Sequence, residues 1–352
     1  MKKLLLLILY ILTFSNSFSQ TNKYQEIVDR YNSENNFNGA VLVAIDGKID
    51  YIGSIGLANQ KGNIKFLPQE KFRIASMTKV FTAILVMKLY EEGKIQLNAT
   101  IGTYFPTYKG AGKDKVTIHH LLTYSSGIEN QAEALLMESY QEKKTLDTYI
   151  DQYCSGKLIT TPGEKSSYSN TEYIILQKII ENVSHKSYAA FLQETILKPL
   201  KLKNTGIINS DVYNPYLGES YTYNPQFKTF ITDTPYRIDN FFGAGNMYST
   251  VQDMLVLNNA LFKPTLLSEK TTSKMLEINQ NLGYTAYGLW GSTGWGNFKE
   301  KFYYRTGGIL GATSNWIHTM DSNKTIIVMS NTDATNLYDL SEKLYLASLE
   351  KK

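Results

Sequence analysis

The segment Phe72-Arg-Ile-Ala-Ser-Met-Thr-Lys79 places a serine and a lysine three residues apart, at the point where a turn becomes a helix. Apolar residues recur at spacings of three and four across residues 77–92, and Gly93 follows as a helix stop. Residues three apart share a helix face, so the ammonium of Lys79 can approach the hydroxyl of Ser76. A helix N-terminus also favours negative charge, because the helix dipole is positive there. The segment therefore predicts a nucleophilic serine with a lysine beside it.

The Ser76–Lys79 pair is weak evidence on its own. A serine hydroxyl needs a neighbouring base to accept its proton. Lysine can be that base only if its surroundings lower its pKa from about 10.4 towards 7. The same pattern recurs at Ser348-Leu-Glu-Lys351, where no later segment remains to complete a site. Taken alone, the first pair is better explained by a helix cap and a solvated lysine.

Two further segments carry residues suited to the same site. Tyr168-Ser169-Asn170 follows a Pro-Gly turn and precedes a predicted helix. Its simplest interpretation is a packed aromatic ring followed by a helix cap. Arg305-Thr306-Gly307-Gly308 ends a predicted strand, and its simplest interpretation is a strand end that becomes a glycine turn. The order and context of the three segments change these interpretations.

Together the three segments resemble the active-site motifs of serine β-lactamases, penicillin-binding peptidases and related esterases. The resemblance is nearest to the class C branch, whose second motif is Tyr-x-Asn, and it covers nearly all of residues 20–352. It implies an α/β (α+β) fold of the β-lactamase/DD-peptidase type, with an antiparallel sheet flanked by helices and a mostly helical second subdomain. Three more segments contribute to it: His120-Leu-Leu-Thr-Tyr-Ser-Ser-Gly127, Gly243-Ala-Gly245 and Ser249-Thr-Val-Gln-Asp253.

The resemblance implies a role for each motif residue. Ser76 would attack a carbonyl and carry the acyl group, while Lys79 and Tyr168 would share the proton transfers, with the identity of the base left open. Asn170 would bind the substrate amide and orient Lys79. The backbone N–H groups of Ser76 and Gly308 would form the oxyanion hole.

The third motif would bind substrate through Arg305, Thr306 and Gly307, and its glycines would let the substrate backbone approach the strand edge. Arg305 stands where relatives usually carry lysine or histidine. An arginine cannot relay a proton, but its charge can lower the pKa of Lys79 and Tyr168. Because its fork also suits a carboxylate, we expect a substrate with a terminal carboxylate. Tyr124 replaces a histidine of relatives and is expected to be structural.

Sheet signals lie at both ends of the chain and helical signals lie between them. Residues 39–45 and 48–53 flank an Asp-Gly pair that predicts a tight hairpin turn. Further strands are predicted at residues 284–290, 298–305, 313–319 and 325–330, the last two joined by a turn at residues 321–324. Helices are predicted at residues 24–31, 119–122, 171–182, 188–196, 250–261 and 333–349.

This alternation predicts a discontinuous domain organisation. An α/β subdomain would comprise residues 20–75 and 283–352, and a mostly helical insertion would comprise residues 76–282. Residues 213–242 are rich in aromatic and turn residues without a clear period, so they are expected to form an irregular cleft wall.

The N-terminus has the layout of a removable secretory signal. Lys2 and Lys3 precede an apolar run at residues 4–14, and Ser17 and Ser19 suit cleavage after residue 19. The run is shorter than the roughly 20 residues that span a bilayer, although an uncleaved anchor is the alternative. The prediction is a chain exported across the inner membrane to the periplasm or the exterior, with no membrane-spanning segment after cleavage.

The composition excludes several classes of protein. The formal net charge of +4 and the 43% hydrophobic content are typical of a globular protein and give no reason to expect a nucleic-acid partner. Cys154, the only cysteine, is expected to be buried. The sequence has no Gly-x-Ser-x-Gly motif, which a Ser-His-Asp hydrolase of the α/β-hydrolase type would carry. The adjacent pair His119-His120 does not have the spacing of zinc ligands. His318 is expected to be structural. No metal or cofactor is predicted.

We therefore expect a secreted serine hydrolase with an acyl-serine intermediate. A peptidase or amidase for D-alanyl-type substrates is the first choice. A class C-like β-lactamase and a class VIII-like carboxylesterase are alternatives, and a penicillin-binding sensor or scaffold is the non-enzyme alternative. The partner would be a small molecule or peptide, and the sequence predicts no oligomeric state.

Overall fold

The computed structural model describes residues 23–67, 70–131, 136–212, 214, 217–233 and 236–350. The predicted signal at residues 1–19 lies outside these residues. Within the described ranges, no helix combines the length and the apolar character that crossing a membrane requires.

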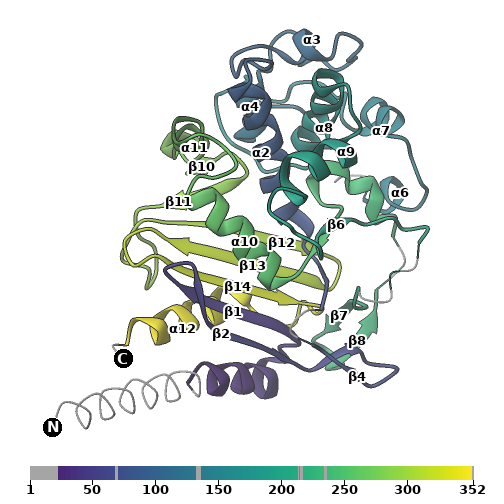
Figure 1. Ribbon diagram of the computed structural model, residues 1–352. Helices are drawn as coiled ribbons and strands as arrows, with labels where there is room; N and C mark the ends of the chain where they lie inside the picture. The colour runs from purple at the N-terminus through teal and green to yellow at the C-terminus, as the bar shows by residue number, and fades with distance from the viewer. Residues whose placement is uncertain are drawn as a thin grey trace, which may run out of the picture.

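A seven-stranded antiparallel sheet joins the two ends of the chain (Figure 1). Its strand order is β10-β11-β12-β13-β14-β1-β2, so the first strand pairs with the last. The strands are β1 (Gly39–Ile45), β2 (Lys48–Ile55), β10 (Thr285–Ala286), β11 (Leu289–Ser292), β12 (Phe302–Ile309), β13 (Ala312–Thr319) and β14 (Lys324–Ser330).

The predicted N-terminal hairpin is confirmed. Asp46 and Gly47 have φ of 54° and 77°, the conformation that a tight two-residue turn requires. The prediction of one strand at residues 284–290 is wrong, because Gly288, with φ of 80°, reverses the chain between β10 and β11. Strand β12 continues past its predicted end at Arg305 to Ile309, so the glycines of the third motif lie inside a paired strand.

Strand β1 shows how the sheet separates two hydrophobic cores. Successive side chains of a strand point to opposite faces. Val41 and Val43 pack with the helix at residues 23–35 and with α12 (Leu337–Leu349) on one face. Leu42 packs on the other face in the larger core, which also takes in α10 (Val251–Phe262) and the helical region.

Helix α2 (Thr78–Glu91) lies at the centre of the helical region, directly after the 3-10 turn η1 (Ala75–Met77). Most of its residues are buried on every side, and it packs against α8 (Thr171–Ser184). Around this pair lie the remaining helices: α3 (Ile101–Tyr104), α4 (Ile118–Leu122), α6 (Leu136–Ser139), α7 (Leu146–Tyr153), α9 (Tyr188–Leu192), the π-helical turn η2 (Gln193–Leu197), η3 (Ile238–Ala244), α11 (Glu269–Met275) and η4 (Gln280–Leu282). The helices predicted at residues 77–92, 119–122, 171–182, 188–196 and 250–261 are thereby confirmed within a few residues.

Short strands connect the two regions. They are β3 (Leu57–Asn59), β4 (Ile64–Lys65), β5 (Phe72–Arg73), β6 (Gly206–Ile207), β7 (Tyr221–Asn224), β8 (Thr229–Thr232) and β9 (Met247–Ser249). The β7–β8 hairpin corrects the prediction that residues 213–242 are irregular throughout. Its strands are only four residues long and contain a single buried residue, Tyr221, so they carry no clear apolar alternation.

The predicted structural roles of Cys154 and His318 agree with the structure. The Cys154 thiol is fully buried, and burial raises its pKa. The His318 ring stacks on Phe262 at 3.9 Å, and its Nδ1 lies 2.9 Å from Thr325 Oγ1. Burial lowers the pKa of His318 to about 4, so the ring is neutral at physiological pH.

Candidate active site

Ser76 lies in the η1 turn, between strand β5 and helix α2. The turn is anchored to strand β9 by a hydrogen bond from Ile74 N to Met247 O at 3.0 Å. Ala75 has φ of 45°, a left-handed conformation that costs a non-glycine residue free energy. The turn leaves the Ser76 side chain partly exposed above a buried helix.

Three side chains meet around Ser76 Oγ, as the sequence predicted for Ser76, Lys79 and Tyr168. The Tyr168 hydroxyl lies 2.6 Å from Ser76 Oγ. Lys79 Nζ lies 3.1 Å from Ser76 Oγ and 2.8 Å from the Tyr168 hydroxyl. The three polar atoms therefore form a closed triangle in which protons can pass between any two groups.

The ammonium of Lys79 is fully buried and surrounded by oxygen atoms. Besides Ser76 and Tyr168, it donates to Asn170 Oδ1 at 2.7 Å and to the Ala244 carbonyl at 2.7 Å. The pKa of Lys79 is lowered to about 8, chiefly by burial; the charge of Tyr168 opposes this effect, and the charge of Arg305 adds to it. Asn170 thus contacts Lys79 as predicted, and the Ala244 carbonyl is a partner that the sequence did not indicate.

Tyr168 has an exposed ring and an enclosed hydroxyl. The ring is 44% exposed, whereas the hydroxyl accepts from Lys79 Nζ and from Arg305 Nη2 at 3.1 Å. Burial alone would raise the pKa of this phenol. The positive charges of Lys79 and Arg305 outweigh burial and lower the pKa of Tyr168 to about 7. A phenolate is therefore accessible near neutral pH.

Arg305 is turned into the protein, whereas its predicted contact with a substrate carboxylate, which stays a prediction, would require an accessible guanidinium. The side chain has no exposed surface. Its Nε donates to the Ser76 carbonyl at 2.8 Å, and its Nη1 donates to the Tyr124 hydroxyl at 2.9 Å. Together with the bond to Tyr168, these contacts direct the guanidinium at the protein's own oxygen atoms. The other predicted effect of Arg305, a lowered pKa for Lys79 and Tyr168, agrees with this placement.

Aromatic rings enclose the Arg305 guanidinium. Its central carbon lies 4.5 Å from the centre of the Trp290 ring and 6.0 Å from that of Tyr124, and such contacts stabilise a buried cation. Trp290 and Tyr124 are themselves stacked with an interplanar angle of 12°. The sequence predicted a structural role for Tyr124 but did not identify Trp290. Trp290 reaches Arg305 through the pairing of β11 with β12, which the sequence pattern does not reveal.

Glu172 is a further group that the motif search missed. It is 2% exposed, and its Oε1 accepts from Ser126 Oγ at 2.7 Å. Burial raises its pKa. Its place two residues after Asn170, in the buried first turn of α8, is the local signal that could have found it.

The two glycines of β12 differ in their surroundings. A Cβ on Gly307 would lie 2.3 Å from the Ile74 carbonyl, so this glycine lets the strand touch the turn that carries Ser76. A Cβ on Gly308 would meet no atom within 4 Å. Thr306 and Gly308 point to the exposed side of the strand, where a substrate has access. The predicted reason for Gly307, access for substrate, is therefore replaced by close packing against the protein backbone.

A cavity of about 230 Å³ opens beside this cluster. Tyr168, Asn170 and Gly308 form one side of it. Tyr140, Tyr236, Phe241 and Ile309 are among the residues that form the rest. Two of these come from residues 213–242, so the predicted cleft wall is present there.

Residues with strained backbones surround the site. Tyr124, Phe242 and Leu310 have φ of 55°, 44° and 52°, and Ala75 adds a fourth such residue. Bulky residues seldom adopt positive φ, and such residues gather at functional sites in proteins. Each of the four adjoins a group already described: Ser76, Arg305, the Ala244 carbonyl or the cavity.

Metal-ligating residues do not gather in the part of the chain that the structure describes: no group of three His, Cys, Asp or Glu side chains there could hold a metal ion. His120 instead caps helix α4, where its Nδ1 accepts from Thr117 N at 3.2 Å.

Comparisons with known proteins identify relatives of this chain. The model of the family described as Beta-lactamase matches residues 24–351. The teichoic acid D-alanine hydrolase of Staphylococcus aureus is 30% identical over 258 residues, which are 73% of this chain and 62% of that protein. The chain thus spans less than two thirds of the length of that relative.

Solved structures share the fold. FmtA from Staphylococcus aureus is 26% identical, with a TM-score of 0.78 over 95% of this chain and 88% of that one. The D-amino acid amidase from Ochrobactrum anthropi SV3, in complex with D-phenylalanine, is 20% identical, with a TM-score of 0.81 over 94% of this chain and 99% of that one. The expected β-lactamase/DD-peptidase type of fold is therefore confirmed.

Proposed function

This chain belongs to the Beta-lactamase family, and from that premise we propose that it hydrolyses D-alanyl-type esters or amides through an acyl-Ser76 intermediate. The triangle of Ser76, Lys79 and Tyr168 carries the proposal, since each polar atom lies within 3.1 Å of the other two. No other arrangement among the described residues combines a serine with two groups whose pKa values lie near neutrality.

Tyr168 is the general base for acylation in this proposal. Its phenolate accepts from Lys79 and Arg305, and Ser76 is the third donor at 2.6 Å. As Ser76 Oγ attacks the substrate carbonyl carbon, its proton moves to the Tyr168 oxygen. The new C–O bond leaves a negative charge on the carbonyl oxygen, and the N–H groups of Ser76 and Gly308 stabilise it.

Collapse of this intermediate completes acylation. The neutral Tyr168 hydroxyl donates its proton to the leaving oxygen or nitrogen as the scissile bond breaks. The acyl group stays on Ser76. A water molecule then attacks the ester carbonyl, Tyr168 accepts a proton from that water, and it returns the proton to Ser76 Oγ. Lys79 keeps its proton throughout, and its charge stabilises the phenolate.

The substrate class rests on the relatives. The teichoic acid D-alanine hydrolase of Staphylococcus aureus is named for releasing D-alanine, an activity that an acyl-serine site performs on an ester. The predicted signal at residues 1–19 would bring this chain to the same side of the membrane as cell-envelope polymers. We therefore propose that the protein acts outside the cytoplasm, on esters or amides of the cell envelope.

Intact-protein mass spectrometry tests the proposed function. The protein is exposed separately to a fluorescent penicillin, to p-nitrophenyl acetate and to a D-alanyl ester of glycerol, with Ser76→Ala alongside. We expect an acyl adduct or turnover with the esters and none with Ser76→Ala. Adducts that persist in Ser76→Ala contradict the nucleophile. Rapid turnover of penicillin without ester turnover identifies a β-lactamase instead, and no reaction with any of the three identifies a scaffold.

A further inference from the structure

The two N–H groups of the proposed oxyanion hole come from segments that are remote in sequence. Ser76 lies in the η1 turn, and Gly308 lies one residue before the end of β12. Both N–H groups must reach a single oxygen atom, and a misplacement of about 1 Å can cost about 10²-fold in rate. A contact that fixes these two segments relative to each other therefore affects the reaction without touching the substrate.

The turn that follows β12 is strained and tightly enclosed. Leu310 has φ of 52°, a left-handed conformation that costs a non-glycine residue free energy. A Cβ on Gly311 would lie 2.2 Å from the backbone of Tyr221, so the turn packs directly against the β7–β8 hairpin. A strained conformation of this kind persists only where neighbouring contacts hold it.

Asp233 supplies such a contact from the end of the hairpin. It follows β8 directly, and its Oδ2 accepts from Gly311 N at 2.9 Å. Its Oδ1 accepts from Thr222 Oγ1 at 2.6 Å. Hydrogen bonds to an ionised carboxylate are roughly twice as strong as those between neutral groups. Asp233 thereby ties the end of β12 to the hairpin.

The same carboxylate is linked to the segment that carries Ser76. Ser220 Oγ donates to Asp233 Oδ2 and accepts from Arg73 Nη1. Arg73 belongs to β5, the strand just before the η1 turn. Burial lowers the pKa of Arg73, and the negative charges of Asp233 and Glu219 oppose this effect. Asp233 therefore also stabilises the charge of the guanidinium that it holds through Ser220.

We infer that Asp233 is a positioning residue for the reaction, which holds the end of β12 at a fixed distance from the η1 turn and so spaces the two oxyanion-hole N–H groups. Arg73 lies three residues before Ser76. Gly311 lies three residues after Gly308. The hydrogen bonds of Asp233 thus join the two donor segments close to the donors themselves. The inference rests on the proposed function, in which these two N–H groups bind one oxygen.

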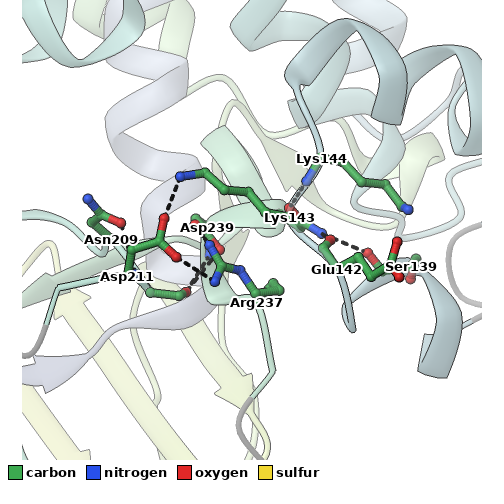
Figure 2. A network of polar contacts seen from close by, with 10 residues as sticks. Ser139, Glu142, Lys143, Lys144, Asn209, Asp211, Arg237 and Asp239 are labelled. Carbon is green, nitrogen blue, oxygen red and sulfur yellow. Dashed lines mark hydrogen bonds and ion pairs between the residues drawn. The ribbon is translucent and has the colours of Figure 1, made fainter.

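Asp211 offers a contrast, because its carboxylate also pairs with cations but joins other segments (Figure 2). Lys143 and Arg237 approach its two carboxylate oxygens from opposite sides, at 2.5 and 2.7 Å. The Lys143 and Asp211 side chains are half exposed, so this pair contributes little stability. Neither cation belongs to η1 or β12. Removing the Asp211 carboxylate should therefore leave the two N–H groups in place.

Inhibition by phenylboronic acid tests the spacing of the oxyanion hole. Ser76 Oγ forms a bond to boron and its proton moves to Tyr168, which leaves a tetrahedral, negatively charged adduct that resembles the reaction intermediate. We expect Asp233→Ala to lower kcat/KM for p-nitrophenyl acetate at least tenfold, mainly through kcat, and to raise the Ki of phenylboronic acid by a similar factor. A Ki does not depend on the amount of folded enzyme, so lost stability alone would leave it unchanged.

Asp253→Ala is the matched control. The Asp253 carboxylate also accepts from one backbone N–H, that of Asn204 at 2.9 Å, and from one threonine hydroxyl, that of Thr205 at 2.8 Å. It lies in α10, which contains neither donor segment. Asp253→Ala and Asp211→Ala should both keep the Ki of phenylboronic acid within twofold of the wild type.

Ser220→Ala keeps the inference testable if Asp233→Ala fails to fold. Ser220 is 3% exposed, and loss of its hydroxyl breaks the link to Arg73 while the bond to Gly311 N remains, so the Ki should rise at least threefold. A smaller rise than these in the variant that folds, or an equal rise in Asp253→Ala, would overturn the inference and leave the proposed function standing. Turnover or an adduct that survives in Ser76→Ala would overturn the proposed function instead.

Discussion

Two buried cations and one phenol set the chemistry at the scale of single residues. Lys79 and Arg305 both donate to the Tyr168 hydroxyl, and neither has an exposed side chain. Two adjacent positive charges are costly to bury, and the Tyr168 phenolate offsets part of that cost. Its lowered pKa is therefore a consequence of where Lys79 and Arg305 lie rather than of tyrosine itself.

Replacing Arg305 should move the pH dependence of activity. Tyr168 is active as the phenolate, so kcat/KM should rise with pH through its pKa of about 7. Arg305→Gln removes a charge that lowers this pKa, so the rise should shift to higher pH by about one unit or more. Arg305→Lys keeps the charge, so the midpoint of the rise in kcat/KM should stay within a few tenths of a pH unit of the wild type. The measurement is kcat/KM for p-nitrophenyl acetate across pH 5.5–9.5, with hydroxide blanks.

If kcat/KM of Arg305→Gln is reduced by the same factor at every pH, with no shift of the rise, Arg305 does not lower the pKa of Tyr168. The same variants also test the earlier expectation about a substrate carboxylate. Because Arg305 is buried, its loss should slow neutral and carboxylate-bearing esters by similar factors.

Tyr168→Phe isolates the hydroxyl from the ring. The ring contacts with Tyr124 and Trp290 remain possible for phenylalanine, whereas the proton acceptor beside Ser76 is lost. We expect kcat to fall by about 10²- to 10⁴-fold with little change in the melting temperature. Steady-state kinetics and thermal unfolding check this, and a loss below fivefold would assign the base to Lys79.

Strand β12 and the η1 turn meet at the scale of secondary-structure elements. The contact depends on Gly307, since a Cβ there would lie 2.3 Å from the Ile74 carbonyl. The strand alternates, so its buried positions face the turn and its exposed positions face the substrate side. The distance between these two elements determines where Ser76 lies relative to Gly308.

Gly307→Ala should destabilise the protein, and Gly308→Ala should not. The first must push β12 away from η1 and is expected to cost about 1–3 kcal/mol of unfolding free energy. The second adds a methyl group where no atom lies within 4 Å, so its unfolding free energy should change by less than about 0.5 kcal/mol. Denaturant unfolding of both variants checks the contrast. Equal stability of the two would show that the turn and the strand are not in tight contact.

The central sheet separates the site from a second core at the scale of the whole molecule (Figure 1). The helix at residues 23–35 and helix α12 cover one face of the sheet, and their apolar side chains form a core of their own. Ser76, Lys79 and Tyr168 lie in the helical region beyond the other face. The smaller core beneath α12 is therefore separated from the catalytic groups by the sheet.

Leu340→Ala should lower the stability of the protein without changing its catalytic chemistry. Leu340 is fully buried in the core beneath α12, and its truncation is expected to cost about 2–5 kcal/mol of unfolding free energy. At temperatures where the variant is folded, its KM and its pH profile should match the wild type. Denaturant unfolding and kinetics on one preparation check this. A shifted pH profile would show that the second core also positions the site.

Short-range patterns were sufficient for much of the fold and for the closeness of Ser76 and Lys79. The i, i+3 spacing puts Lys79 beside Ser76 on any helix, and the Asp46-Gly47 turn forms its hairpin from local conformational preference. Tyr168 and Asn170 were identified through the resemblance of the three motifs to the family, since their local pattern alone favours a packed ring and a helix cap. The prediction of one strand at residues 284–290 missed the break between β10 and β11. The break depends on the positive φ of Gly288, which does not change the apolar periodicity of the sequence.

Long-range packing decided the rest. The sequence shows that residue 305 is an arginine, but not where its side chain points. That depends on Tyr124 and Trp290, which belong to other segments of the chain and contact the guanidinium. The cavity lining likewise combines Tyr140 and Phe241, which are remote in the sequence and stack on each other in the fold. A residue's type and spacing are local properties, whereas burial, pKa and cavity shape sum contributions from every segment packed nearby. The role of Ser76 was therefore predicted from three motifs taken together rather than from its own helix, and the charge state of Tyr168 and the shape of the pocket came from the tertiary structure.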